Sequence, residues 1–276
     1  MPDLWLGLLV VGLIAGVASG MFGIGGGVII VPALTVFLGF ETVEAISTSL
    51  AALLLPVGIF AVIAYHQAAL LELRASAFIA FGLLATSWFG AEITLSLPVD
   101  TLRRIYGAFL LYISWRFVEP RKLYAAWQAR RVLQVDEPSP LEQATEATPS
   151  DEKITAPDVP WYVILLVGLI AGVASGMFGI GGGAVIVPAL VAILRYDQKL
   201  AVGTSLGALL LPVGLPGVLN YAADDVLDLA AAALVAIGLL VGAIFGARIA
   251  LNLPSKTVKR LYGVFLLFVA LRFILQ

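Results

Sequence analysis

The chain has 276 residues, 61% of them hydrophobic and 12% charged, with a net charge of −2. Soluble domains carry about 25% charged residues, so this composition excludes a soluble domain and indicates an integral membrane protein, and the negative charge argues against nucleic acid as a partner. The absence of cysteine excludes disulfides and thiolate sites, and with a single histidine we expect no metal or other cofactor.

The first half of the chain contains five apolar segments, which are separated by a glycine-rich stretch, by polar turns or by a proline. An apolar helix of about 17–25 residues spans a bilayer, and the second segment is shorter than that. No basic region precedes the first segment, so we interpret it as a retained membrane segment and not as a cleaved signal peptide. The expected segments are 4–21, 28–38, 45–65, 75–97 and 102–118.

Residues 119–160 form a linker between two membrane parts, 1–118 and 161–276. Residues 121–135 mix basic and apolar side chains and could form an amphipathic helix at the membrane surface. Residues 136–153 are rich in Pro, Ser, Thr and acidic residues and are expected to be a tether.

The two membrane parts are copies of one unit. Residues 12–34 and 168–190 agree at 21 of 23 positions, and the offset of 156 residues holds without a gap from about residue 7 to 118. Such a repeat governs the fold prediction. We therefore expect the second half to repeat the five segments.

An odd number of segments per half would give the halves opposite orientations. With both termini outside and the linker in the cytoplasm, twelve Lys and Arg residues lie inside and three outside; with four crossings per half the division is eight against seven. Because Lys and Arg concentrate on the cytoplasmic side, the charges favour the inverted arrangement.

Residues 22–27, FGIGGG, separate the first two segments and recur at 178–183. Residues 4–40 would therefore form either two crossings or a re-entrant hairpin with this bend at its tip. Both alternatives return the chain to its starting side.

The glycine bends are the main candidate site. Irregular backbone within a membrane must be buried in protein or line a cavity, and the first N–H groups of the following helix have no partner within it. These groups and the helix dipole favour an anion. We expect an anion to bind near the midplane through two bends that face each other, as in transporters with inverted repeats, at Gly25, Gly26, Gly27, Gly181, Gly182 and Gly183.

Close helix packing is the alternative explanation for the glycines. It suits Gly16, Gly20, Gly172 and Gly176 better than the anion site does. For the consecutive glycines the anion site is favoured, because glycine disfavours a packing helix by about 1 kcal/mol per residue.

Hydroxyl groups follow the bends in each half. Thr48, Ser49, Thr204 and Ser205 would donate hydrogen bonds either to an oxyanion or to their own helix carbonyls. Ser19 and Ser175 are further possible donors, although small residues are also common at packed interfaces.

The evidence for a functional role is weaker for Pro56, Pro212 and Asn220. Pro56 and Pro212 remove a helix hydrogen bond and would hinge the helix or, as we expect, only kink it. Asn220 has alanine as its repeat counterpart and would contact the substrate or, more in keeping with its position, a neighbouring helix.

Glu92 and Arg248 are charged residues within apolar segments and are repeat equivalents. Intramembrane charges are candidates for function, so Arg248 is a possible substrate contact. Both also lie near a segment end, where snorkelling or a local pair is the expected role. His66 ends the third segment and is expected at the interface.

The residues resemble the TauE/SafE family of sulfite and organosulfonate exporters, also called the toluene-sulfonate uptake permease family. The similarity lies in ASGMFGIGGG followed by VPAL in each half, in STSL and GTSL, and in residues 245–267. It implies an inner-membrane transporter of sulfite, thiosulfate or an organosulfonate such as sulfoacetate. Residues 90–92 read GAE where the second half has GAR, so the first half departs from the pattern at this position.

We therefore predict an all-α polytopic membrane protein with two inverted-topology repeats of about five segments each and broken or re-entrant glycine-tipped helices. The predicted function is secondary transport of a small sulfur-containing anion by alternating access, in contact with membrane lipids. An anion channel, or a transporter of another small anion, is the alternative. A membrane enzyme would need a titratable cluster that these segments lack, and a structural subunit would leave the glycine bends without a reason.

Overall fold

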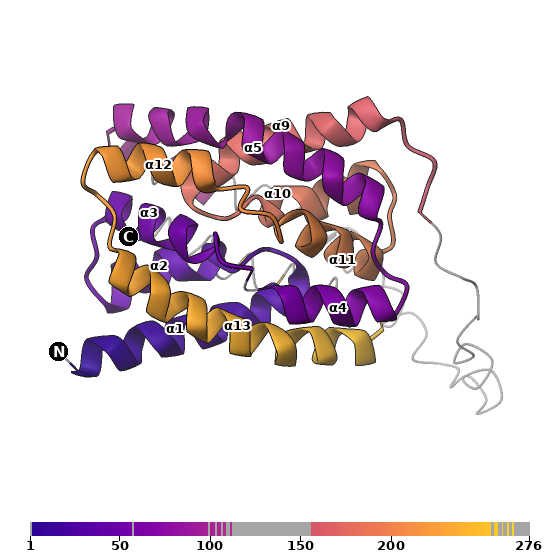
Figure 1. Cartoon of the computed structure of the whole chain (residues 1–276), viewed down its shortest axis with the longest axis horizontal. Coiled ribbons are helices and arrows are strands. Elements are labelled where there is room, and N and C mark those ends of the chain that lie inside the picture. Colours follow the sequence, from indigo (N-terminus) through magenta and orange to yellow (C-terminus); the bar gives the residue numbers. More distant parts are fainter. Residues whose placement is uncertain are drawn as a thin grey trace, which may run out of the picture.

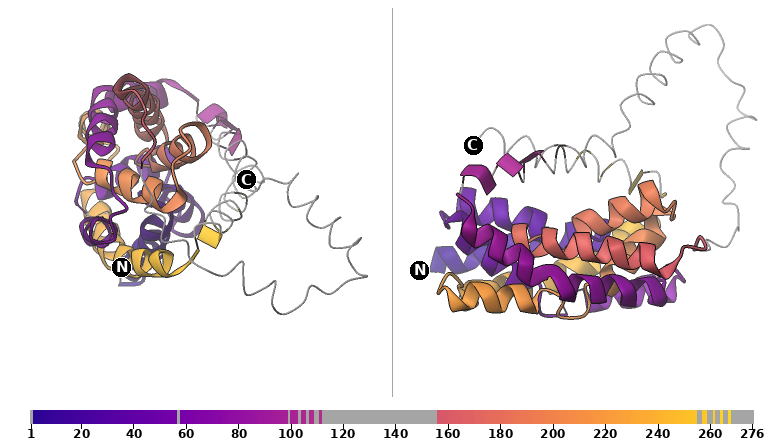
Figure 2. Two further views of the ribbon diagram at one scale, coloured as in Figure 1. Left: turned by 90° about the vertical axis from the view of Figure 1, so that its right-hand side faces the viewer. Right: turned by 90° about the horizontal axis from the view of Figure 1, so that it is seen from above.

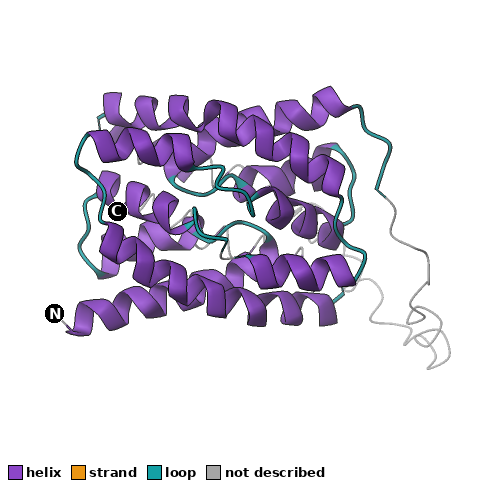
Figure 3. Cartoon of the chain, in the orientation of Figure 1, coloured by secondary structure: helices purple, strands orange, loops and turns teal. Residues whose placement is uncertain are grey.

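The computed structural model describes residues 2–56, 58–98, 100–102, 104, 105, 107, 108, 111, 156–254, 257, 258, 261, 264 and 267. Every regular element among them is helical, as Figure 3 shows. Most of the predicted linker, with its amphipathic helix and tether, and most of the fifth segment of each half lie outside the described residues.

The described part of the first half contains five helices. Their bounds are α1 Pro2–Phe22, α2 Gly27–Phe37, α3 Thr42–Ala52, α4 Ile59–Gln67 and α5 Leu73–Ser96. The equivalent helices of the second half are α9 Trp161–Phe178, α10 Gly183–Pro188 with the π-helical turn η1 Ala189–Ile193, α11 Gln198–Ala208, α12 Leu215–Ala223 and α13 Leu229–Asn252.

Within the described residues, four helices are long and apolar enough to cross a bilayer, namely Leu4–Phe22 within α1, α5, α9 and α13. The α2 helix has 11 residues, or about 16 Å at 1.5 Å per residue. A hydrocarbon core is about 30 Å thick. The pair α1–α2 therefore fits a re-entrant hairpin, and two full crossings do not fit these lengths.

The third segment of each half is broken, not kinked. The expected single stretch over 45–65 consists of α3 and α4, and the expectation of a mere kink at Pro56 is wrong; the same break separates α11 from α12 at Pro212. Proline cannot donate a backbone hydrogen bond and clashes with the preceding turn, and a glycine two residues further on is the N-cap of the next helix. The break lies at the sequence LLLPVG, which is identical at 53–58 and 209–214.

The long helices pair across the two halves. The α1 helix packs along α13, and α5 packs along α9. Most helices appear end-on in the left view of Figure 2, so their axes run in roughly the same direction. Cβ atoms built on Gly16 and Gly20 would lie 2.4 Å and 2.3 Å from carbonyl oxygens of α13, and one built on Gly176 would lie 2.0 Å from a carbonyl oxygen of α5. The close-packing explanation for these glycines is thus confirmed.

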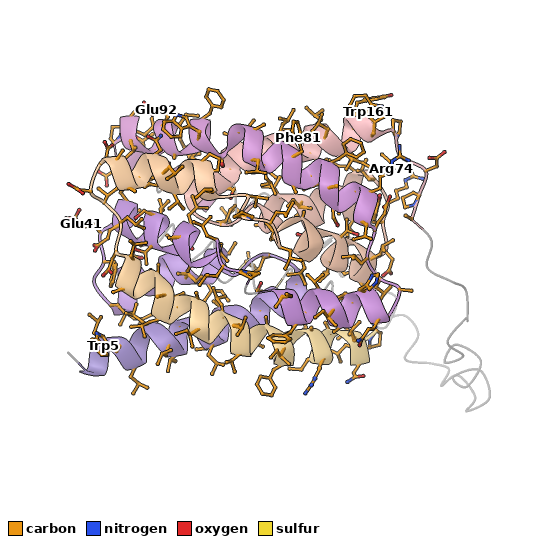
Figure 4. All side chains as sticks on the ribbon, viewed as in Figure 1. Trp5, Glu41, Arg74, Phe81, Glu92 and Trp161 are labelled. Carbon is orange, nitrogen blue, oxygen red and sulfur yellow. The ribbon has the colours of Figure 1, made fainter. Side chains whose placement is uncertain are left out.

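Equivalent helices of the two halves run in opposite directions. In Figure 1, α1 begins at one end of the molecule and α9 at the other, and Figure 4 shows Trp5 and Glu41 at one end and Arg74 and Trp161 at the opposite end. The four breaks in the helices meet between the two long pairs, where the loops converge in Figure 3. This places the glycine bends in the interior of the molecule.

Candidate functional site

The two glycine bends lie back to back at the centre of the molecule. A Cβ atom built on Gly25 would lie 3.8 Å from the Cα atom of Gly181, and the reverse distance is 4.0 Å. Residues 22–28 and 178–184 are all buried. Segments that are 156 residues apart in the sequence thus form one compact structure.

Close packing accounts for the last glycine of each bend. A Cβ atom on Gly27 would lie 2.1 Å from the carbonyl oxygen of Gly179, and one on Gly183 would lie 2.3 Å from that of Gly23. This packing is a sufficient reason for glycine at these two positions, and the anion contact expected for their backbone amides stays a prediction. Neither residue lines the central cavity.

The first two glycines of each triplet are required by the backbone conformation. Gly25 and Gly26 have φ angles of +78° and +95°, and Gly181 and Gly182 have +70° and +83°, a region that costs other residues roughly 1–2 kcal/mol. In each of these turns, backbone N–H groups are left without the carbonyl partner that a continuous helix would provide.

The buried amides of the bends have no acceptor within the described part of the chain. The amide of Gly23 donates to Ser19, and those of Ile29 and Ile30 donate to Gly26, but the five amides between them, 24–28, donate to no described residue. The same holds for 180–184 in the second half. A buried unpaired donor costs about 1–3 kcal/mol, so each bend is suited to a bound acceptor.

Two serines hold the bends together across the halves. The Ser49 hydroxyl donates to the carbonyl oxygen of Gly179 at 2.8 Å, and the Ser205 hydroxyl donates to that of Gly23 at 2.7 Å. A hydroxyl has one proton, so in this arrangement neither serine can also donate to an anion. Their role in the structure is to position the bends.

The neighbouring threonines differ between the halves. The Thr204 hydroxyl oxygen accepts a hydrogen bond from the amide of Glu72 at 3.2 Å, and the Thr204 carbonyl accepts one from Ser76 at 2.8 Å. The Thr48 hydroxyl is buried without a hydrogen-bond partner among the described residues, as is that of Ser175. Neither threonine lines the central cavity.

A cavity of about 20 Å³ lies between the bends and the broken helices. It is lined by Ser19, Gly25, Leu50, Leu53, Gly58, Gly181, Leu206, Leu209, Val213 and Gly214. About 10–15 Å³ is enough for one water molecule. An oxyanion of four or more heavy atoms would need the walls to move apart.

The cavity brings together only some of the predicted residues. Ser19, Gly25 and Gly181 line it, whereas Ser175, Asn220 and Arg248 do not. The leucines and the second pair of glycines were missed. The identical LLLPVG sequence in both halves was the signal that could have identified them, because it marks a second broken helix in each half.

Asn220 and Glu92 form a pair at the periphery. The Asn220 amide donates to a carboxylate oxygen of Glu92 at 3.0 Å and so connects α12 with α5. This agrees with the helix contact expected for Asn220 and the local pair expected for Glu92. Arg248, the repeat equivalent of Glu92, is exposed.

A second hollow, of about 390 Å³, opens where the start of α3 approaches the start of α13. Its acidic lining residues are Glu41, Glu44, Asp225 and Asp228. Carboxylates repel anions, so this hollow does not compete with the central cavity as the anion site.

One family model matches nearly the whole chain. The family model described as "Sulfite exporter TauE/SafE" matches residues 8–273.

The chain belongs to this family. Two relatives from Bacillus subtilis are similar to it: the probable membrane transporter protein YunE, 27% identical over 98% of this chain and 97% of its own length, and the probable membrane transporter protein YdhB, 23% identical over 91% and 93%. The probable membrane transporter protein MJ0441 of Methanocaldococcus jannaschii is 29% identical over 78% of this chain and 71% of its own length. No solved structure matches the chain.

These relatives are named as membrane transporters and not as enzymes. Together with the four apolar helices of membrane-spanning length, they identify this TauE/SafE family member as an integral membrane transporter.

Proposed function

We propose that this protein carries a small sulfur-containing anion across the inner membrane by alternating access around the two glycine bends. The candidate substrates are sulfite, thiosulfate and organosulfonates such as sulfoacetate. The observation that supports the proposal most directly is the set of buried bend amides without an acceptor among the described residues. The family description names sulfite export, so export of sulfite is the first case to test.

A neutral site made of amides suits a solute that must be released again. Backbone N–H groups and a helix dipole attract an anion without a fixed positive charge. Gly25 and Gly181 present their backbones to the cavity, and Ser19 adds a hydroxyl that is 3% exposed. Because none of the residues that line the cavity is charged, an anion would not be held by a strong ion pair.

The small volume of the cavity supports a carrier over an open pore. With room for about one water molecule, the described arrangement offers no continuous path for an anion. The opposed directions of equivalent helices (Figure 1) support inverted repeats. The distribution of Lys and Arg residues favours both termini outside and the linker in the cytoplasm. In such folds, one part rocks against the other around a central site.

The experiment is binding and flux with purified protein. Sulfite, thiosulfate, sulfate and sulfoacetate are titrated for binding, and uptake of the tightest ligand into proteoliposomes is measured against its concentration. The proposal predicts binding of a sulfur anion and a flux that saturates. A flux that rises linearly to high concentration indicates a channel, and the absence of binding by all four anions contradicts the proposed substrate class.

Gly25→Ala tests the site within the chain, with Gly39→Ala as its matched control. Both glycines have positive φ, +78° and +74°, but nothing lies within 4 Å of a Cβ atom at Gly39. Both variants pay the backbone strain of roughly 1–2 kcal/mol, and only Gly25→Ala adds a methyl group at the cavity. We expect Gly25→Ala to lose binding and Gly39→Ala to keep it; equal affinities would argue against the bends as the site.

A further inference from the structure

Two leucines that follow the short helices α3 and α11 cover the glycine bends, and each belongs to the opposite half. A terminal carbon of Leu209 lies 3.2 Å from the Cβ position of Gly25, and a terminal carbon of Leu53 lies 2.8 Å from that of Gly181. Both leucines line the central cavity. The first half therefore closes the bend of the second half, and the second half closes that of the first.

A second pair of leucines, one helical turn earlier in the chain, also packs against glycines of the opposite half. A terminal carbon of Leu50 lies 3.0 Å from the Cβ position of Gly214, and one of Leu206 lies 3.7 Å from that of Gly58. Leu50 and Leu206 are 1% and 2% exposed, whereas Leu53 and Leu209 are only partly buried. Of the four leucines that line the cavity, Leu53 and Leu209 are therefore the less buried pair.

We propose that Leu53 and Leu209 are the two gates of the transport site, one for each side of the membrane. This inference rests on the proposed function, because it assigns the gates of that same anion site. A leucine side chain against the bend leaves its amides in an apolar environment and keeps a hydrated anion out. The side chain must move away before the bend can bind an acceptor.

The positions of Leu53 and Leu209 would allow one gate to open while the other stays closed. The α3 and α11 helices enter the centre from opposite ends of the molecule, as Figure 1 shows. Each gate follows directly on one of these helices and stands just before the break at Pro56 or Pro212, where the backbone has no continuous helical hydrogen bonds. A displacement of one broken helix relative to the bend of the other half therefore moves a single gate.

The test uses a cysteine at Ser19, which lines the cavity, in a protein that has no other cysteine. Ser19→Cys is combined with Leu53→Ala, with Leu209→Ala and with both, and a membrane-impermeant thiol reagent is applied to proteoliposomes of one orientation from either side. We expect slow labelling in Ser19→Cys alone, labelling about tenfold faster from one side with Leu53→Ala, and the same gain from the other side with Leu209→Ala. The double gate variant should label from both sides.

Leu83→Ala and Leu239→Ala are the matched controls. These leucines lie 2.6 Å and 2.7 Å from the Cβ positions of Gly182 and Gly26, but they belong to the long helices α5 and α13 and do not line the cavity. Labelling of Ser19→Cys should not change in them. Where an alanine variant does not elute as a single folded species, the valine variant, which removes one methylene group, replaces it.

The labelling assay needs no anion, so it separates this proposal from the proposed function. Gains from the same side for both gate variants, no gain in either, or rapid labelling of Ser19→Cys alone would overturn the gate assignment even if sulfite binds. Side-specific gains without binding of any tested anion would keep the gates and contradict the sulfur-anion substrate.

Discussion

The hydroxyl of Ser205 donates a hydrogen bond to the carbonyl oxygen of Gly23, 2.7 Å away and 182 residues earlier in the chain. Ser49 makes the equivalent bond to Gly179 at 2.8 Å. Each half therefore fixes the glycine bend of the other by one serine. The two bonds therefore fix the position of each bend relative to the opposite half.

The serine bonds should contribute to stability and to anion affinity together. In Ser205→Ala the buried carbonyl of Gly23 loses its donor, which costs about 1–3 kcal/mol, and Ser49→Ala should do the same for Gly179. Thermal unfolding in detergent measures the loss. Ser96→Ala is the control, because Ser96 is exposed and bonds only to a carbonyl one turn earlier. Equal melting temperatures for Ser205→Ala and Ser96→Ala would refute the structural role.

The Glu92–Asn220 pair should couple α5 to α12 without forming part of the site. Asn220 is 7% exposed and donates to Glu92. We expect Glu92→Ala to lower stability by about 1–3 kcal/mol, because it leaves the buried Asn220 amide without this acceptor. Asn220→Ala should lower it by less, because Glu92 is exposed, and the double variant should lower it by less than the sum. Glu92→Gln keeps an acceptor oxygen and should be milder. Strictly additive losses would show that the bond is not formed.

Arg248→Ala serves as the repeat-related control for that pair. Arg248 is exposed and does not line the cavity. We therefore expect the anion affinity of the Arg248→Ala variant to match that of the parent protein within twofold, about 0.4 kcal/mol. Isothermal titration measures the affinity. A tenfold weaker affinity would restore Arg248 as a substrate contact.

Tyr196 predicts an alkaline limit to stability. Burial, together with the hydrogen bond that its hydroxyl donates to Glu72, raises the pKa of Tyr196 above its ordinary value of 10.0. The folded state therefore binds this proton more tightly than the unfolded state, so the contribution is complete below pH 10 and is lost as the pH rises further. Tyr196→Phe should lower stability at pH 8 and flatten its decline above pH 10. An unchanged decline in this variant would contradict the assignment.

The inverted arrangement predicts labelling from opposite sides of the membrane. Trp5 and Trp161 begin equivalent helices at opposite ends of the molecule (Figure 4). Single cysteines at these positions, in a chain without native cysteine, should react with an impermeant thiol reagent from outside for Trp5→Cys and only from the cytoplasm for Trp161→Cys. Reaction of both from one side would exclude inverted repeats.

Much of the fold of this protein could be predicted from its sequence, because the features that indicate it lie in short continuous stretches of the chain. Composition alone indicates a membrane protein, and the recurrence of residues 12–34 at 168–190, with 21 of 23 positions identical, indicates two equivalent units. The long helices follow from runs of apolar residues, and the bend before α2 follows from consecutive glycines, whose backbone can adopt positive φ. The family resemblance depends on the same local motifs.

Only the tertiary structure decided what the individual residues do. A serine hydroxyl can donate to an anion or to a carbonyl oxygen. Ser49 and Ser205 donate to carbonyl oxygens because the fold brings next to each of them a carbonyl that lies more than 100 residues away in the chain. Gly27 is required by the oxygen of Gly179 packed against it. Leu53 and Leu209 are ordinary apolar residues in the sequence, and they become gates because the exchange of α3 and α11 between the halves places them over the bends. Such long-range contacts leave no periodic or local pattern in the chain.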